Sequence, residues 1–230
     1  AIKKSEAEAS TIVKDVYVSI SDSVSAIYLD HFLELENDII SEEHIKSYFK
    51  GDNFKELYSE DSTPLHSFPI SYRVDNLKSV SDPIGLNANS LTTRWHNIIS
   101  KNSEIKKIYN LFDEIDLHIK QIVLSNYASS LAVLNEMESS LGAISIDLGK
   151  TKTLLSFTLD NQLIYFDTIL LGTYNFTKDL SNVLSIDLDE AEHIRKRMDK
   201  IDFNKEVDKK EIEYFNIYES RAEELIDLIF

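Results

Sequence analysis

The sequence predicts a mixed α/β fold in two parts, and three observations support that prediction. Segments of the first hundred residues alternate apolar and polar side chains with a period of two, which is typical of half-buried strands. Three apolar segments then follow closely, at residues 143–148, 153–159 and 163–171, and the turn pair Asp160-Asn161 separates the last two. Helical periodicity dominates the remainder. We therefore expect a β-rich α+β module, then a three-stranded meander, then helices.

The β-rich module is predicted element by element. A short helix over residues 1–13 precedes strands at residues 16–21, 24–29, 68–74 and 91–95. Ser41 is the expected N-cap of a helix over residues 42–50, which Gly51 ends. Pro69 restricts its strand to an edge or to its first residues, because proline has no backbone N–H. The polar residues 51–66 are expected to form a loop.

The middle of the chain shows helical spacing. Apolar side chains recur every three or four residues and predict an amphipathic helix over residues 104–117, with Ile105, Ile108, Phe112 and Ile115 on its apolar face. A strand at residues 119–124 and a helix at residues 128–137 then lead into the meander.

Two further helices follow the meander. Asp187 and Glu190 are spaced as a capping box and open a helix that ends near Met198. Residues 199–211 are charged and loop-like, and the last helix runs from about Lys210 to the end. Its expected buried face consists of Phe215, Tyr218, Ala222, Leu225, Ile226 and Ile229.

Composition excludes several classes of protein. Among 230 residues, 40 are acidic and 24 basic, a formal net charge of -16, which repels nucleic-acid backbones and anionic membranes. The absence of cysteine excludes disulfides and thiolate zinc sites. No apolar run reaches the roughly 18 residues of a membrane span, and no signal peptide is visible. We expect a cytoplasmic protein that does not bind nucleic acid.

The strongest chemical motif lies between the first two strands of the meander. An apolar strand ends at Asp147, and Gly149-Lys150-Thr151-Lys152-Thr153 follows. Backbone amides in such a turn can face a phosphate, the lysines add positive charge, and a carboxylate at a strand end can hold Mg²⁺ through water. An ordinary hairpin turn explains the same residues. A Walker A loop is excluded, because residue 144 is Ile instead of Gly and a strand follows the loop.

Basic residues near the C-terminus admit two interpretations. Arg195 and Arg197 lie in the last turn of their helix, where positive charge complements the helix dipole. Arg221 lies among glutamates on the final helix and is expected to form a local ion pair with Glu219, Glu223 or Glu224. The alternative for all three arginines is contact with a partner.

Five stretches, in order and spacing, resemble the FtsA family of bacterial cell-division proteins. They are the helix and strand at residues 6–21; Leu65 to Ile70 with Tyr72, Asp75 and Asp82-Pro83-Ile84-Gly85-Leu86; His96-Asn97 with the 104–117 helix, Ala128-Ser129-Ser130 and Val133-Leu134; residues 141–153; and residues 219–225. Together they span nearly the whole chain.

The resemblance implies a partial actin-like (ribonuclease-H-like) fold with an inserted α+β subdomain, called 1C in the family. It assigns residues 1–20 to the end of subdomain 1A, 21–91 to 1C, 92–140 to the return through 1A, 141–172 to the start of 2A, and 173–230 to 2B with the start of its exit helix. The family's first phosphate loop, adenosine-contacting turn and membrane-targeting tail have no counterpart here. We therefore expect an internal fragment of a longer protein.

The resemblance also implies ATP and Mg²⁺ as cofactors of the full-length protein. The family's second phosphate loop corresponds to Asp147, Gly149, Lys150, Thr151, Lys152 and Thr153, with Asp147 as the catalytic and magnesium-binding position. Three of these residues, Lys150 to Lys152, replace the family's Gly-Gly-Thr, and glycines there let the backbone approach phosphates. We expect no tight ATP binding by this fragment, and micromolar affinity in calorimetry would contradict that. Whether the full protein hydrolyses ATP stays open.

The function implied is a cell-division scaffold that tethers FtsZ filaments to the membrane and self-associates in actin-like protofilaments. Subdomain 2B would bind the C-terminal tail of FtsZ, with Arg221 as the first candidate contact and Arg195 and Arg197 as weaker ones. Subdomain 1C would contact a neighbouring copy and later division proteins. The protein would lie at the inner face of the cell membrane at the division site, attached only through a tail absent here. An active actin-fold ATPase and the related PilM family of pilus-assembly proteins are the alternatives.

Overall fold

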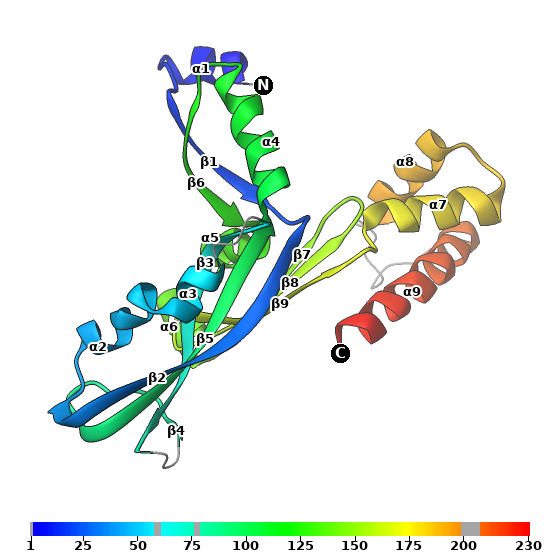
Figure 1. Ribbon diagram of the computed structural model, residues 1–230. Coiled ribbons are helices and arrows are strands. Elements are labelled where there is room, and N and C mark those ends of the chain that lie inside the picture. The colour runs from blue at the N-terminus through cyan, green and yellow to red at the C-terminus, as the bar shows by residue number, and fades with distance from the viewer. Residues whose placement is uncertain (1, 58–60, 76–78, 199–207) are drawn as a thin grey trace. The chain divides into compact units, whose positions relative to one another are not determined.

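The computed structural model describes residues 2–57, 61–75, 79–198 and 208–230 (Figure 1). Its internal contacts define two compact units, which we describe separately. The first comprises Ala1–Ala143 and Ser156–Tyr165, and the second Ile144–Leu155 and Phe166–Phe230. None of the helices among the described residues has both the length and the apolar character that crossing a membrane requires.

The first unit contains a four-stranded antiparallel sheet in the order β2-β5-β3-β4. Its strands are longer than predicted, and their bounds are β2 Val24–Ile39, β3 Ser62–Val74, β4 Ser79–Val80 and β5 Asn87–Lys101. The predicted segments at 24–29, 68–74 and 91–95 lie inside these strands. In β2 the alternation continues beyond residue 29, since Leu33 and Leu35 are more buried than Glu34 and Glu36. The interleaved charged residues hid that continuation.

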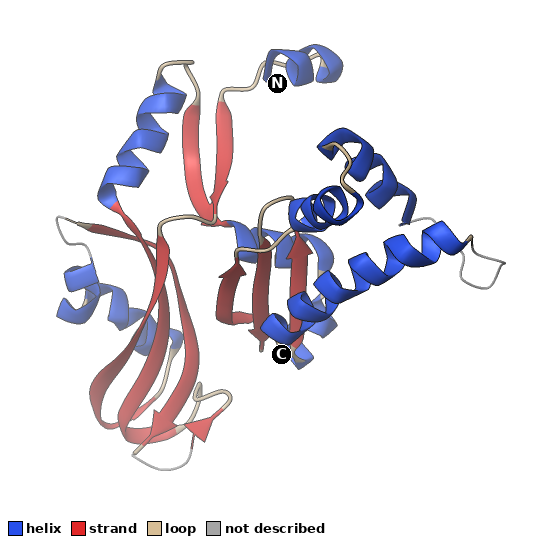
Figure 2. Ribbon diagram, turned by 90° about the vertical axis from the view of Figure 1, so that its right-hand side faces the viewer, coloured by secondary structure: helices blue, strands red, loops and turns tan. Residues whose placement is uncertain are grey.

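Helices cover one face of this sheet (Figures 1 and 2). The predicted helix over residues 42–50 is confirmed in place, as α2 (Glu42–Lys46) followed by a 3₁₀ turn, η1 (Ser47–Lys50). The loop predicted for residues 51–66 is wrong, because α3 occupies Asp52–Leu57 and β3 begins at Ser62. Only Phe54 and Leu57 are apolar in that helix, too few to reveal it as amphipathic. Leu57 is nonetheless buried, and Phe54 lies edge-on to Tyr48.

An aromatic pair forms the centre of this core. The rings of Tyr48 on η1 and Trp95 on β5 stack with centroids 4.3 Å apart, and both side chains are buried. The hydroxyl of Tyr48 donates to Asn97 Oδ1 at 2.9 Å, and the hydroxyl of Ser67 donates to the same oxygen at 2.7 Å. Such a pair adds about 0.5–1.5 kcal/mol to the stabilisation from apolar burial. It fixes the helical cover on the sheet.

The prolines of β3 lie where the ladder is irregular. The register of β3 against β5 shifts between Pro64 and His66 and again between Pro69 and Ser71. On the other side of β3, strand β4 pairs with Tyr72 and Arg73 alone among the described residues. The prediction that Pro69 lies at a sheet edge is therefore confirmed.

A two-stranded parallel sheet completes the main framework of the first unit. Strands β1 (Asp15–Ile20) and β6 (His118–Leu124) pair in parallel with a register shift between Val16 and Tyr17, and α4 (Asn102–Asp113) packs on them through Ile105. Both strands were predicted. The helix predicted over 104–117 ends early, and Ile115 lies beyond it with 53% of its surface exposed.

Two other helices of this unit differ from the prediction. The first helix, α1, covers Ile2–Ala9 instead of residues 1–13. The helix predicted at 128–137 is two helices, α5 (Ser125–Val133) and α6 (Glu136–Leu141). The break occurs because Asn135 caps α6: its Oδ1 accepts from the amide of Glu138 at 2.9 Å.

The three-stranded meander is confirmed as the sheet β7-β8-β9. Its strands are Ala143–Leu148, Thr153–Leu159 and Gln162–Ile169. Asp160 and Asn161 both have positive φ, 51° and 60°, which is the conformation of a two-residue type I′ hairpin turn. Asparagine and aspartate tolerate that conformation, so this turn was predictable from sequence.

Three helices form most of the second unit. They are α7 (Thr173–Leu184), α8 (Leu188–Met198) and α9 (Lys209–Ile229). The predicted cap of α8 is present, since the amide of Glu190 donates to Asp187 Oδ1 at 2.8 Å. Leu225 of α9 is buried, whereas Ile226 is 54% exposed and was wrongly placed on the buried face. Most of the loop predicted at 199–211 lies outside the described residues.

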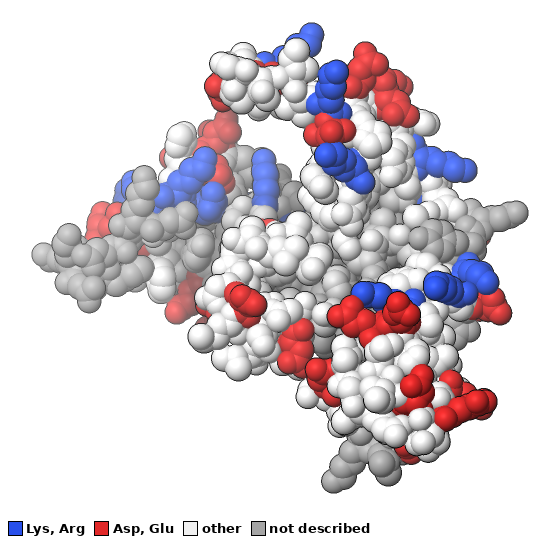
Figure 3. All heavy atoms as spheres, turned by 90° about the vertical axis from the view of Figure 1, so that its left-hand side faces the viewer, with Lys and Arg blue, Asp and Glu red and all other residues white. Residues whose placement is uncertain are grey.

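Acidic side chains gather at one end of the first unit. On the face shown in Figure 3 several acidic side chains lie among uncharged ones towards the lower end. The exposed residues Glu34, Glu36, Asp38, Glu42 and Glu43 belong to this end. Such a patch repels acidic partners.

His66 on β3 is held in its neutral form. Its Nε2 accepts a hydrogen bond from the amide of Leu124 at 3.0 Å, where β6 joins α5. Its ring also packs against those of Phe68 and Tyr127. Burial lowers the pKa of His66 from 6.5 to about 4.

We expect acidification to destabilise the first unit through His66. Between pH 6.5 and pH 4 the unfolded chain binds a proton at this histidine and the folded chain does not, so stability present above pH 6.5 is lost. The expected loss between pH 7 and pH 5 is about 1–2 kcal/mol, measured by urea unfolding. His66→Gln keeps an acceptor for Leu124 without titrating, so it should flatten the profile.

The matched control is His193→Gln, at an exposed position on α8, which should keep the wild-type pH profile. The comparison between variants is needed because burial also lowers the pKa values of His31 and His96. An unchanged profile in His66→Gln would contradict the assignment.

Candidate functional site

The predicted phosphate hairpin forms a tight turn between β7 and β8. The amide of Gly149 donates to the carbonyl of Lys152 at 3.0 Å and closes the turn. A Cβ on Gly149 would lie 2.8 Å from that same carbonyl oxygen, so glycine is required there. None of residues 148–153 has a positive φ. Lys150 and Thr151 therefore adopt this turn without backbone strain.

This turn also caps helix α7. The amides of Thr173 and Tyr174 donate to the carbonyls of Gly149 and Lys150 at 2.9 and 2.8 Å. The first amides of a helix have no partner within the helix and form an anion site when left open. Here the carbonyls of the turn accept hydrogen bonds from these two amides in place of an anion. The two amides at the N-terminus of α7 are therefore not available to a phosphate.

Three other groups at the tip remain suited to an anion. The amides of Lys150 and Thr151 donate to no residue that the structure describes, and both residues are exposed. The ammonium of Lys150 lies 5.9 Å from the ring centroid of Tyr174. These groups fit phosphate oxygens. Asp147 is exposed at the end of β7, and in the described residues no three His, Asp or Glu side chains gather in a metal-binding arrangement.

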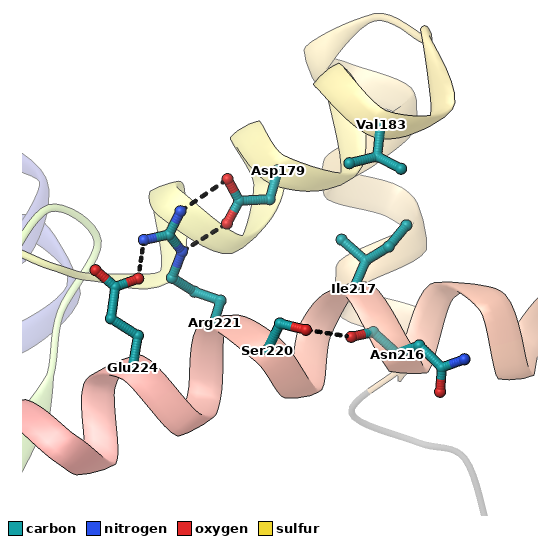
Figure 4. Close-up of a pocket in the computed structure, with 7 residues that line it drawn as sticks. All are labelled: Asp179, Val183, Asn216, Ile217, Ser220, Arg221 and Glu224. Atoms are coloured by element: carbon teal, nitrogen blue, oxygen red, sulfur yellow. Dashed lines mark hydrogen bonds and ion pairs between the residues drawn. The ribbon is translucent and has the colours of Figure 1, made fainter.

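A second candidate site lies between α7 and α9 (Figure 4). A pocket of about 450 Å³ opens there, lined by Asp179, Val183, Asn216, Ile217, Ser220, Arg221 and Glu224. Figure 4 shows Val183 and Ile217 facing one another at one end and the guanidinium of Arg221 at the other. The pocket therefore combines an apolar end with a charged end, where one guanidinium lies beside two carboxylates.

Arg221 is held by two carboxylates. Its Nε and Nη2 donate to the two oxygens of Asp179 at 2.6 and 2.9 Å, and its Nη1 donates to Glu224. Bidentate pairing with a carboxylate fixes the guanidinium plane. The bonds to Asp179 raise the pKa of Arg221, so the side chain stays charged. Arg221 is 25% and Asp179 26% exposed.

The local ion pair predicted for Arg221 is confirmed with Glu224, whereas neither Glu219 nor Glu223 bonds to it in the described structure. Asp179 was missed. It lies 42 residues earlier, on another helix, and no spacing rule in the sequence connects the two positions. Only the packing of α7 against α9 brings them together.

The other two candidate arginines lie on α8 and do not line this pocket. The Nε and Nη2 of Arg195 donate to the two oxygens of Glu192 at 3.0 and 2.9 Å, and Glu192 also accepts from the hydroxyl of Thr177 at 2.5 Å. These bonds lower the pKa of Glu192 from 4.5 to about 2. Arg197 is more exposed and lies 3.9 Å from Glu211. Arg195 is thus held in an α7–α8 network, and Arg197 is the more accessible.

Comparison with known proteins identifies one domain. Residues 22–99 match the family described as "SHS2 domain inserted in FTSA". That range contains β2, α2, η1, α3, β3 and β4, and most of β5. The helix-covered four-stranded sheet therefore corresponds to the matched SHS2 domain.

Curated relatives extend the similarity along the chain. It is 30% identical to cell division protein FtsA of Agrobacterium fabrum over 136 residues, covering 59% of this chain and 31% of that protein. FtsA of Buchnera aphidicola subsp. Acyrthosiphon pisum is 26% identical over 195 residues, 84% of this chain and 46% of that protein. The chain thus spans about a third to a half of these relatives. The resemblance to FtsA is confirmed.

A solved structure supports the fold. A chain of the "PilM-PilN type IV pilus biogenesis complex" aligns over 97% of this chain and 59% of its own length, with a TM-score of 0.56 and 13% identity. At that identity the match shows the fold alone. The predicted actin-like fold with an inserted subdomain is confirmed, and the division into five segments stays a prediction.

Gly172 tests the junction between the turn and α7. A Cβ there would lie 2.6 Å from the carbonyl oxygens of Gly149 and Lys150, closer than real Cβ atoms come to backbone. Gly172→Ala should push the turn away from the helix and cost about 1–3 kcal/mol in urea unfolding. The control Gly51→Ala, whose Cβ meets nothing nearer than 3.2 Å, should cost less. Equal losses at the two positions would contradict this account of the junction.

Proposed function

We propose that this chain, which carries the SHS2 domain inserted in FtsA and is similar in sequence to FtsA proteins, is part of a cell-division scaffold. The similarity to proteins named for cell division is the observation that supports the role most strongly. In this proposal the whole protein tethers FtsZ filaments to the inner face of the membrane at the division site and self-associates in actin-like protofilaments.

The proposed docking site for the FtsZ tail is the pocket between α7 and α9. An acidic tail with apolar residues needs a cation beside an apolar surface, and the pocket offers Arg221 at one end with Val183 and Ile217 at the other. Val183 is 63% exposed, so its apolar surface is available. The net charge of -16 opposes an acidic peptide, which makes this local cation decisive.

The SHS2 domain is the proposed surface for self-association and for later division proteins. Strand β2 is an edge strand of its sheet and runs over 16 residues. Its side chains Phe32 and Ile39 are 54% and 59% exposed. A long edge with exposed apolar side chains is suited to pairing with another chain.

Nucleotide binding is a second candidate function of the whole protein. The free amides of Lys150 and Thr151, together with the lysine ammonium groups, would hold phosphate oxygens of ATP. Asp147 would hold Mg²⁺ through water, and Thr153 anchors the turn through its bond to the carbonyl of Leu171 at 2.7 Å. Bound Mg²⁺ would neutralise developing phosphate charge. The exposed tip supports this role, whereas the turn's engagement with α7 limits it.

Arg221 should control binding of the FtsZ tail. Arg221→Ala removes the cation from the pocket, so the dissociation constant of a fluorescent FtsZ tail peptide should rise at least about tenfold in fluorescence anisotropy. Arg221→Glu should abolish binding. Both losses should be largest at low salt, where charge contacts are least screened.

Arg197→Ala is the matched control, because it removes the same charge outside the pocket. It should change the dissociation constant less than about twofold. Circular dichroism should first show that each variant is folded. Unchanged binding in Arg221→Glu would refute this docking site, and absence of tail binding by the wild-type protein would favour the PilM-like alternative.

A further inference from the structure

Arg221 carries more hydrogen-bond donors than its two partners use. A guanidinium has five N–H donors. Asp179 takes one from Nε and one from Nη2, and Glu224 takes one from Nη1. The remaining donors, one on each terminal nitrogen, reach no residue that the structure describes. The outer end of the guanidinium therefore retains capacity for another carboxylate.

The two carboxylates that hold Arg221 differ in kind. Asp179 comes from α7, is 26% exposed and bonds through both of its oxygens. Glu224 lies three residues beyond Arg221 on the same helix, is 52% exposed and bonds through one oxygen. An exposed i,i+3 pair contributes little stability, so it opens at small cost. The bidentate, half-buried pair with Asp179 is the one that persists.

We propose that Glu224 is a built-in competitor for the acidic peptide that docks on Arg221. It holds one donor of Nη1 at the outer end of the guanidinium in the free protein, and a carboxylate of the peptide displaces it there. Asp179 is a positioning residue that keeps the guanidinium plane directed into the pocket throughout. The inference rests on the proposed docking function. It adds that Glu224 sets the affinity of the pocket for the acidic peptide.

Charge and geometry support this competition. While Glu224 holds Nη1, an approaching carboxylate meets a like charge beside the cation it needs. When Glu224 swings away, Nη1 and Nη2 together present a bidentate edge that matches a carboxylate. Glu224 also lines the pocket in which the peptide would lie. Binding therefore exchanges the carboxylate of Glu224 for a carboxylate of the peptide on Arg221. This exchange makes binding weaker than it would be without Glu224, and it selects peptides whose acidic group reaches Arg221.

The decisive variant is Glu224→Gln, which keeps the size of the side chain and removes its charge. In fluorescence anisotropy with the FtsZ tail peptide, it should tighten binding by about three- to tenfold. Its control is Glu223→Gln, which changes the net charge equally at an exposed residue that does not bond to Arg221, and should tighten binding less than about twofold. Asp179→Asn should act in the opposite direction and weaken binding.

The outcomes separate this inference from the docking function. If the wild-type protein binds and Glu224→Gln binds no tighter than Glu223→Gln, the competitor role is wrong and the docking site stands. If no variant binds the tail, the docking site is wrong and the competitor role falls with it. Binding seen with Glu224→Gln alone supports both. A thermal melt of Asp179→Asn shows whether its weaker binding comes from misfolding. If this variant is misfolded, the test rests on Glu224→Gln and its control alone.

Discussion

The bidentate ion pair between Arg221 and Asp179 is the interaction on which the functional account of the second unit depends. It joins α9 to α7, and it directs a charged guanidinium into the pocket that those helices form. A half-buried pair of this kind contributes modest net stability, because desolvation offsets much of the attraction. Its larger effect is geometric. Without Asp179 the arginine would be bonded only to the exposed Glu224 of its own helix, and its guanidinium would not be fixed in the pocket.

A second constraint acts where the turn after β7 meets the start of α7. Gly149 and Gly172 let the backbones approach so closely that turn carbonyls cap the helix. The chain thereby forms a tight turn with lysine and threonine at its tip. Because the turn uses no positive φ, these residues fit it. The carbonyls of this loop therefore cap α7, and the amides of Lys150 and Thr151 remain available to an anion.

Sequence reasoning predicted the elements whose signal is local. The meander, its Asp160-Asn161 turn and the cap at Asp187 follow from turn and capping chemistry that neighbouring residues determine. It failed where tertiary packing decides: α3 is stabilised by burying Leu57 and part of Phe54, and β2 extends through charged residues that face outward. The candidate site divides in the same way. Arg221 and Glu224 are neighbours on one helix and were expected to pair, whereas Asp179 becomes their partner only through the packing of α7 on α9.

The central claim is that Arg221 bonds directly to a carboxylate of the docked FtsZ tail. A double-mutant cycle tests it most directly, pairing Arg221→Ala with neutral replacements of each acidic residue of the peptide. The account predicts a coupling energy of about 1–3 kcal/mol for one acidic position and values near zero for the others. Coupling near zero at every position would contradict the claim, because Arg221 would then act on binding only through the structure of the pocket or through long-range charge.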